Sequence, residues 1–288
     1  MLELLIGLLG AGTPYLLATL GEVYAERSGV MNLGLEGIIS LGAFTGFAVF
    51  YQTGSIPLAM LLSGVVGLLL SLVHAVVSIS FRANQIVSGI ALSMLGLGLS
   101  GFFGRSYVGL KAPPTPFHGL DPIMIFALVL SFVLWFVMFR TRIGLMVRAT
   151  GENPSAADAQ GIDVYKVRYA CVAFGGFLGG MAGAYLSTIY TPMWIEGLSA
   201  GRGWICIALV ILASWNPLRA IIASYIFGGI EILQFRLQVL NLGVRPEFYL
   251  MLPYLSAMAV LLIFSRETMR KKWAFPAALG QPYSREEA

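Results

Sequence analysis

The chain has 288 residues, of which 58% are hydrophobic and only 11% are charged, and its formal net charge is +4. Soluble domains carry about 25% charged residues, so this composition excludes an ordinary water-soluble fold, whereas a fold embedded in lipid needs no polar cover. The positive charge does not indicate a nucleic-acid partner, because the Lys and Arg residues stand in the gaps between apolar runs, as is typical of membrane topology.

Apolar runs follow one another along the whole chain, and a helix needs about 20 mainly apolar residues to cross a bilayer. The runs are continuously apolar, unlike the alternating strands of a membrane barrel. The seventh run, residues 203–215, is too short to span a membrane alone, so we expect it to be tilted, broken or re-entrant. The pattern predicts an all-α polytopic bundle of about nine transmembrane helices (eight to ten), in residues 4–21, 37–51, 57–81, 85–104, 122–139, 168–190, 203–215, 219–235 and 246–264.

The basic residues divide unequally between alternate gaps, thirteen against five. Because cytoplasmic loops carry the excess of Lys and Arg, the larger set is expected to face the cytoplasm, with the N-terminus outside and the C-terminus cytoplasmic. The larger set is Arg27, Arg82, Arg140, Arg142, Arg148, Lys166, Arg168, Arg219, Arg266, Arg270, Lys271, Lys272 and Arg285, and the smaller is Arg105, Lys111, Arg202, Arg236 and Arg245.

Small residues recur at helix-packing spacing inside several runs, and such grooves let helices approach closely in lipid. We interpret them as packing within the chain rather than as a subunit interface. One transmembrane domain, residues 1–264, is therefore expected, and the polar stretch 265–288 is expected to be a cytoplasmic tail. The small-residue series are Gly175, Gly179 and Gly183; Gly176, Gly180 and Ala184; and Gly96, Gly98, Gly101 and Gly104.

The stretch between the first two apolar runs places Glu22, Glu26, Arg27, Asn32 and Glu36 close to membrane depth. Ionisable groups there are costly unless they are paired or face water, and an ion pair between Glu26 and Arg27 would satisfy both. Irregular backbone at depth is tolerated only where it lines a cavity or is buried in protein. The stretch thus indicates either a broken helix beside a translocation path or an ordinary turn at the interface.

The longest internal polar gap, about residues 140–167, contains a complete short-helix signature. Asn153 is suited to be the N-cap, Pro154 to be the first helical residue, and Gly161 to end the helix in a left-handed conformation. Such a helix can press into a groove of a soluble partner, or it can be a plain linker. The turns between cap and stop are formed by Ala156, Ala157, Asp158, Ala159 and Gln160.

Glu231 lies inside the eighth apolar run, followed by Gln234 and Gln238. A carboxylate there is a functional candidate by default, although a hydrogen bond to a neighbouring helix would also explain it. The chain carries no Gly-rich nucleotide-binding loop ending in Lys-Ser/Thr, no His or Cys spacing typical of a metal site, and only two histidines. We therefore expect no catalytic residues and no cofactor in this chain.

Three segments, in the right order, resemble the permease subunits of bacterial sugar, nucleoside and branched-chain amino acid ABC importers. The resemblance is strongest to the nucleoside branch, which depends on basic-membrane-protein lipoproteins. The segments are Glu26-Arg-Ser-Gly-Val-Met-Asn-Leu-Gly-Leu-Glu-Gly37 with Leu41-Gly-Ala-Phe44; Gly151-Glu-Asn-Pro-Ser-Ala-Ala157 with Gly161 and Ile162, similar to the coupling-helix motif; and Gly201-Arg-Gly-Trp204 with Trp215-Asn-Pro-Leu218 and Phe227-Gly228.

The resemblance implies a type II importer-like permease in the bacterial plasma (inner) membrane, contributing half of a path for a nucleoside or similar small polar solute. It also implies three partners: a second, larger permease, an ABC ATPase with two nucleotide-binding domains, and a periplasmic or lipoprotein substrate-binding protein. ATP and Mg would be bound by the ATPase, which would engage residues 153–161.

Two alternatives stay open for the function. The first is a permease of the same family that carries simple sugars or another small solute. The second is an ion-coupled secondary transporter with Glu231 or Glu22 as its coupling site, which would take up solute without partner proteins. A membrane enzyme is disfavoured, because no catalytic constellation is present.

Overall fold

The computed structural model describes residues 2–115, 117, 119–240, 243, 245–264 and 275–285, and over these residues the fold is all-helical. Short turns of other helix types, η1 (Val76–Ser80), η2 (Arg105–Tyr107) and η3 (Leu186–Tyr190), extend α3, α4 and α8. The α-helices are α1 (Leu2–Arg27), α2 (Leu35–Thr53), α3 (Ile56–Ala75), α4 (Gln85–Gly104), α5 (Pro122–Arg140), α6 (Arg142–Glu152), α7 (Pro154–Ala159), α8 (Val164–Tyr185), α9 (Arg202–Leu212), α10 (Pro217–Val239), α11 (Pro246–Leu250) and α12 (Leu252–Phe264).

Within the described chain, 7 helices are long and apolar enough to cross a membrane. They correspond to seven of the expected runs, and the all-α membrane bundle is confirmed. The seventh run forms the 11-residue helix α9, and the last run is divided between α11 and the 13-residue α12. The prediction of nine crossings is therefore met only in its coarser form, a multi-pass helical bundle.

Helix α8 is the centre of the bundle, and its glycines let it lie against α1, α2 and α3 at backbone distance. A Cβ on Gly180 would overlap the carbonyl oxygen of Ser63 in α3, and one on Gly183 would overlap that of Ile39 in α2. On the α1 side, a Cβ on Gly175 would lie 3.1 Å from the carbonyl oxygen of Gly21. The prediction that this small-residue series packs within the chain is confirmed.

Two crossings of the bundle are interrupted by non-helical segments. The first re-entrant segment, residues 28–34, follows α1, and the Ser93 hydroxyl of α4 donates to the carbonyl of Leu33 (2.8 Å), so α2 begins inside the bundle. The second re-entrant segment, residues 191–201, follows η3 and leads inward to α9. Of the two alternatives for the stretch between Glu22 and Gly37, the structure favours a buried break, because residues 28–34 are non-helical and most of them are buried. The seventh run forms only the short helix α9, preceded by non-helical chain.

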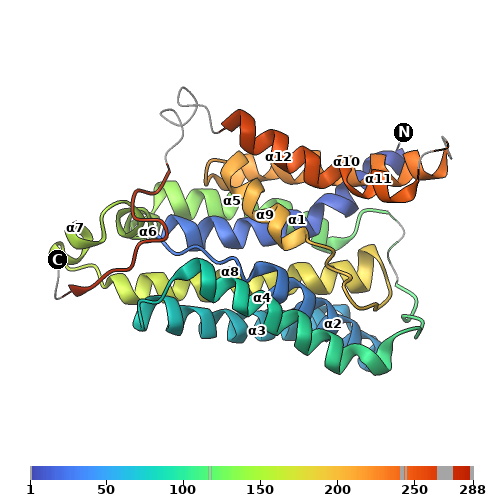
Figure 1. Cartoon of the computed structure of the whole chain (residues 1–288), viewed down its shortest axis with the longest axis horizontal. Coiled ribbons are helices and arrows are strands. Elements are labelled where there is room, and N and C mark those ends of the chain that lie inside the picture. The colour runs from blue at the N-terminus through green and yellow to red at the C-terminus, as the bar shows by residue number, and fades with distance from the viewer. Residues whose placement is uncertain are drawn as a thin grey trace.

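The two re-entrant segments come from opposite ends of the elongated bundle (Figure 1). Helix α7 and the segment 275–285 lie at one end, called here the α7 end, while the first residues of α1 lie at the other. Segment 275–285 folds back onto the bundle: the amide of Ala278 donates to Gly151 (2.9 Å) and that of Gly280 to Gly29 (3.2 Å). Of the expected tail, residues 265–274 and 286–288 lie outside the described residues.

Candidate functional site

The carboxylate of Glu36, in the first turn of α2, binds the end of the second re-entrant segment and the start of α9. Its Oε1 accepts hydrogen bonds from the Ser199 hydroxyl (2.6 Å) and the Gly201 amide (2.8 Å), and its Oε2 accepts one from the Gly203 amide (2.7 Å). The first amides of a helix have no partner inside the helix, and its N-terminus carries partial positive charge, so a carboxylate is stabilised there. Glu36, on α2, is thus the N-terminal cap of α9.

The other end of α9 carries the opposite charge. The chain turns there through Ser214 and Trp215, both left-handed at φ 52°, and the Arg27 guanidinium donates to their carbonyls at 3.3 and 3.2 Å. A cation stabilises the negative end of a helix dipole. The half-helix α9 is therefore held by an acidic residue of α2 at one end and a basic residue of α1 at the other.

The ion pair expected between Glu26 and Arg27 is wrong. Glu26 Oε2 accepts a hydrogen bond from the Trp215 indole (2.5 Å), while Arg27 binds backbone carbonyls. The reason is geometric, because adjacent residues of a helix do not face each other. Both side chains instead reach the end of α9, which fixes the position of Trp215 from two directions.

The first re-entrant segment is anchored by Glu22. Its Oε1 accepts a hydrogen bond from the Asn32 amide (3.0 Å), and the Asn32 side chain in turn accepts one from the Gly34 amide (2.9 Å). Within the described chain, Glu22 Oε2 and Glu26 Oε1 are buried without a hydrogen-bond partner. The predicted path residues Glu22, Asn32 and Glu36 therefore support the broken backbone directly.

Glu231 of α10 reaches the same N-terminus of α9 as Glu36 and forms a buried ion pair with Arg202, the first residue of α9 (2.5 Å). It also accepts hydrogen bonds from the hydroxyls of Tyr15 (2.9 Å) and Tyr190 (3.2 Å). Sequence reasoning missed this partner, since it counted Arg202 with the residues of one external side. The short apolar run beginning at residue 203 was the available signal that Arg202 lies within the bundle.

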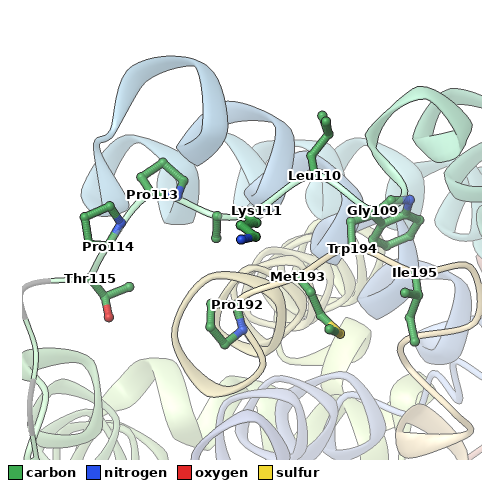
Figure 2. Close-up of a pocket in the computed structure, with 11 residues that line it drawn as sticks. Gly109, Leu110, Lys111, Pro113, Pro114, Thr115, Pro192, Met193, Trp194 and Ile195 are labelled. Atoms are coloured by element: carbon green, nitrogen blue, oxygen red, sulfur yellow. The ribbon is translucent and has the colours of Figure 1, made fainter.

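A hollow of about 530 Å³, called here the distal hollow, lies at the end of the bundle opposite α7. Figure 2 shows its two walls, the loop Gly109–Thr115 and the start of the second re-entrant segment, Pro192–Ile195. The buried Trp194 packs on Phe44 (ring centroids 5.7 Å apart). Lys111 is the one charged residue among its lining residues.

Helix α7 has the expected capping. The Asn153 side chain accepts a hydrogen bond from the Ala156 amide (3.0 Å), Pro154 is the first residue, and Gly161 adopts φ +83°. Ala157 is buried against the bundle, so α7 presents its remaining surface outward. The exposed residues are Asn153, Ser155, Ala156, Ala159, Gln160 and Gly161.

Besides the packing of Ala157, two further contacts connect α7 to the rest of the chain. Its neighbour α6 ends beside α1, where a Cβ on Gly151 would overlap the carbonyl oxygen of Arg27. On the other side, Asp158 accepts hydrogen bonds from the Arg285 guanidinium, which holds the pKa of that carboxyl below its usual range. The exposed helix is therefore continuous, through α6 and Arg27, with the end of α9.

Comparisons with known proteins give one family and several relatives. Residues 4–262 match the family described as branched-chain amino acid transport system / permease component. The chain is similar to a putative glucose ABC transporter permease of Haloferax volcanii (37% identical, covering 96% of this chain and 95% of the relative) and to the guanosine ABC transporter permease NupQ of Bacillus subtilis (37%, 94% and 92%). A second guanosine permease of Bacillus subtilis, NupP, is 24% identical (76% and 70%). No solved structure matches the chain.

Proposed function

This chain belongs to the family of branched-chain amino acid transport system permease components and is an ABC transporter permease subunit; from that premise we propose that it forms half of the translocation path of an importer for nucleosides. The relatives named for guanosine and nucleosides support this substrate class, and the relative named for glucose supports sugars as the second candidate.

The observation that carries the mechanism is the exposed, capped helix α7. A rigid helix at the tip of the bundle is suited to receive force from a soluble ATPase. Displacement of α7 would pass through α6 to Arg27, and from Arg27 to the carbonyls that end α9. ATP binding in the partner would thereby favour one of two arrangements of the re-entrant segments.

We propose that the α7 end faces the cytoplasm. The described Lys and Arg residues support this orientation, because most of them gather at that end. Those at the α7 end are Arg27, Arg82, Arg140, Arg142, Arg148, Lys166, Arg168, Arg219 and Arg285, and those at the opposite end are Arg105, Lys111, Arg236 and Arg245.

The proposed assembly has four parts in a bacterial inner membrane. A second and larger permease completes the path, as the pair NupP and NupQ suggests. An ATPase with two nucleotide-binding domains docks on residues 153–161 and holds ATP and Mg, so this chain needs no cofactor and performs no catalysis. A periplasmic or lipoprotein binding protein delivers solute to the end opposite α7, where the distal hollow opens (Figure 2).

Uptake by the complete transporter tests the proposal. Ala159→Arg places bulk and charge on the exposed face of α7 and should abolish guanosine uptake and co-purification of the ATPase. Lys166→Ala, an exposed change at the same end but outside α7, should alter neither. Ion-gradient-driven uptake that survives deletion of the ATPase would favour the secondary transporter instead.

A further inference from the structure

A cavity of about 250 Å³ lies beside the Arg202–Glu231 pair, at the N-terminus of the half-helix α9. Four parts of the chain that are distant in sequence form its walls. On α10, Glu231 stands 14 residues from Pro217 (231 − 217), about 21 Å along the axis at 1.5 Å per residue, and so lies well inside the bilayer span. The lining residues that matter here are Tyr15, Arg202, Glu231, Gln234, Phe235 and Tyr254.

Gln234 is the first sign that this cavity receives a polar ligand. The residue is only 5% exposed and lines the cavity, and its amide makes no hydrogen bond to the described residues and is not sealed from the cavity. Buried amides are almost always hydrogen-bonded, because removing one from water without a partner is costly. Two neighbouring hydroxyls are already engaged: Tyr254 donates to the carbonyl of Ala200, and Tyr15 donates to Glu231. Gln234 offers two donors and an acceptor to an incoming molecule, and the Nε of Arg202, buried without a partner among the described residues, offers one more donor.

The charges of the cavity determine which molecule it accepts. Its two charged lining residues, Arg202 and Glu231, neutralise each other at 2.5 Å. A zwitterionic amino acid would have to bury an ammonium and a carboxylate with no free counter-charge on this wall, which is costly at membrane depth. An uncharged solute avoids that cost.

The remaining lining side chains are aromatic. Tyr15, Phe235 and Tyr254 present ring surfaces from α1, α10 and α12. Such surfaces suit a flat ring face on the ligand, while the polar groups meet its hydroxyls. The volume is below the roughly 300 Å³ at which pockets for drug-sized ligands begin, so the cavity holds one small molecule.

Building on the proposed function, we propose that this cavity is a binding subsite on the translocation path for an uncharged solute that combines a flat ring face with hydroxyl groups. Nucleosides and hexoses share this chemistry, and amino acids do not. The subsite lies where a broken helix presents its N-terminus inside the bundle, an arrangement that other transporters use for solutes near the bilayer midplane.

The first test compares two identical substitutions on α10 in the complete transporter. Gln234→Leu removes the free amide from the cavity and should lower guanosine uptake at low concentration about tenfold, the effect of one lost hydrogen bond to a solute. Gln238→Leu makes the same change one turn further along, outside the lining, and should leave uptake unchanged. Equal uptake by the two variants overturns the subsite, while ATP-dependent import would still stand.

The second test measures occupancy without transport. Gln234→Cys in the assembled complex is labelled with a small methanethiosulfonate reagent, and the native Cys171 and Cys206 are buried. Guanosine should slow labelling most, glucose should slow it if hexoses are also substrates, and leucine should have no effect. Protection by leucine, absence of protection by both guanosine and glucose, or failure of the cysteine to react overturns the proposal. Protection that persists while uptake proves independent of the ATPase would reject the importer and keep the subsite.

Discussion

The guanidinium of Arg285 donates to both carboxylate oxygens of Asp158, with Nε 2.9 Å from Oδ2 and Nη2 2.5 Å from Oδ1. This contact attaches the segment 275–285 to α7, and the buried Tyr283 packs beside it against Ala157 and Val164. The same segment bonds to the ends of α1 and α6 through Gly280 and Ala278. The position of α7 therefore depends on the tail as well as on the helices that flank it.

The first prediction concerns this attachment. Because Arg285 lowers the pKa of Asp158, the contact stabilises the docked segment at any pH above the ordinary Asp value of 3.8, and it is lost as the pH falls through the lowered value. Hydrogen exchange of the Ala278 and Gly280 amides should therefore be slow at neutral pH and should lose protection only in strong acid. Arg285→Ala should remove that protection at neutral pH.

The matched control is Lys166→Ala, which deletes the other exposed ion pair of this region, with Asp163 (3.0 Å). It should leave the two amides protected. Unchanged protection in Arg285→Ala would show that the backbone bonds alone hold the segment.

The second prediction concerns Glu36. Glu36→Ala leaves the Ser199 hydroxyl and the Gly201 and Gly203 amides without their acceptor, at a cost of about 1–3 kcal/mol for each group that stays buried and unpaired. A clearly lowered unfolding temperature in detergent is expected. Glu196→Ala removes an exposed carboxylate of the same re-entrant segment and should change the temperature little. Equal stability of the two variants would contradict the capping role.

The third prediction separates two glycines that look alike in sequence. Gly180→Ala should be strongly destabilising, because the new Cβ would overlap the backbone of α3 and rigid helices would have to move apart. Gly98→Ala, with nothing within 4 Å of the new Cβ, should be neutral or should stabilise α4 by up to about 1 kcal/mol. Thermal unfolding of the two variants decides, and a destabilised Gly98→Ala would indicate that this face of α4 meets another subunit.

The local features of this fold were predictable from sequence, whereas the long-range ones were not. Helix α7 was located to the residue because its cap, first proline and terminal glycine are adjacent in the chain. The Arg202–Glu231 pair spans 29 residues and the bond from Gly203 to Glu36 spans 167, so periodicity and spacing carry no sign of either. Counting basic residues by gap treats every Arg as part of a loop, and this is why Arg202 was assigned to an external side.

The fourth prediction concerns the buried ion pair between Arg202 and Glu231. Arg202→Met leaves the Glu231 carboxylate buried without its cation, and breaking a buried pair from one side typically costs about 3–5 kcal/mol. The double variant Arg202→Met with Glu231→Gln should recover most of this stability, because the neutral amide needs no counter-charge, its oxygen still accepts from one of the two tyrosine hydroxyls, Tyr15 or Tyr190, and its NH2 group can donate to the other. Thermal unfolding of both variants and the two parents measures the coupling.

If the Arg202–Glu231 pair serves only the fold, guanosine uptake by the double variant should return with its stability. If it also shapes the cavity beside Gln234, stability should return while guanosine uptake stays low, since Arg202 and Glu231 both line that cavity. A double variant no more stable than Arg202→Met would show that the buried charge is not the source of the cost.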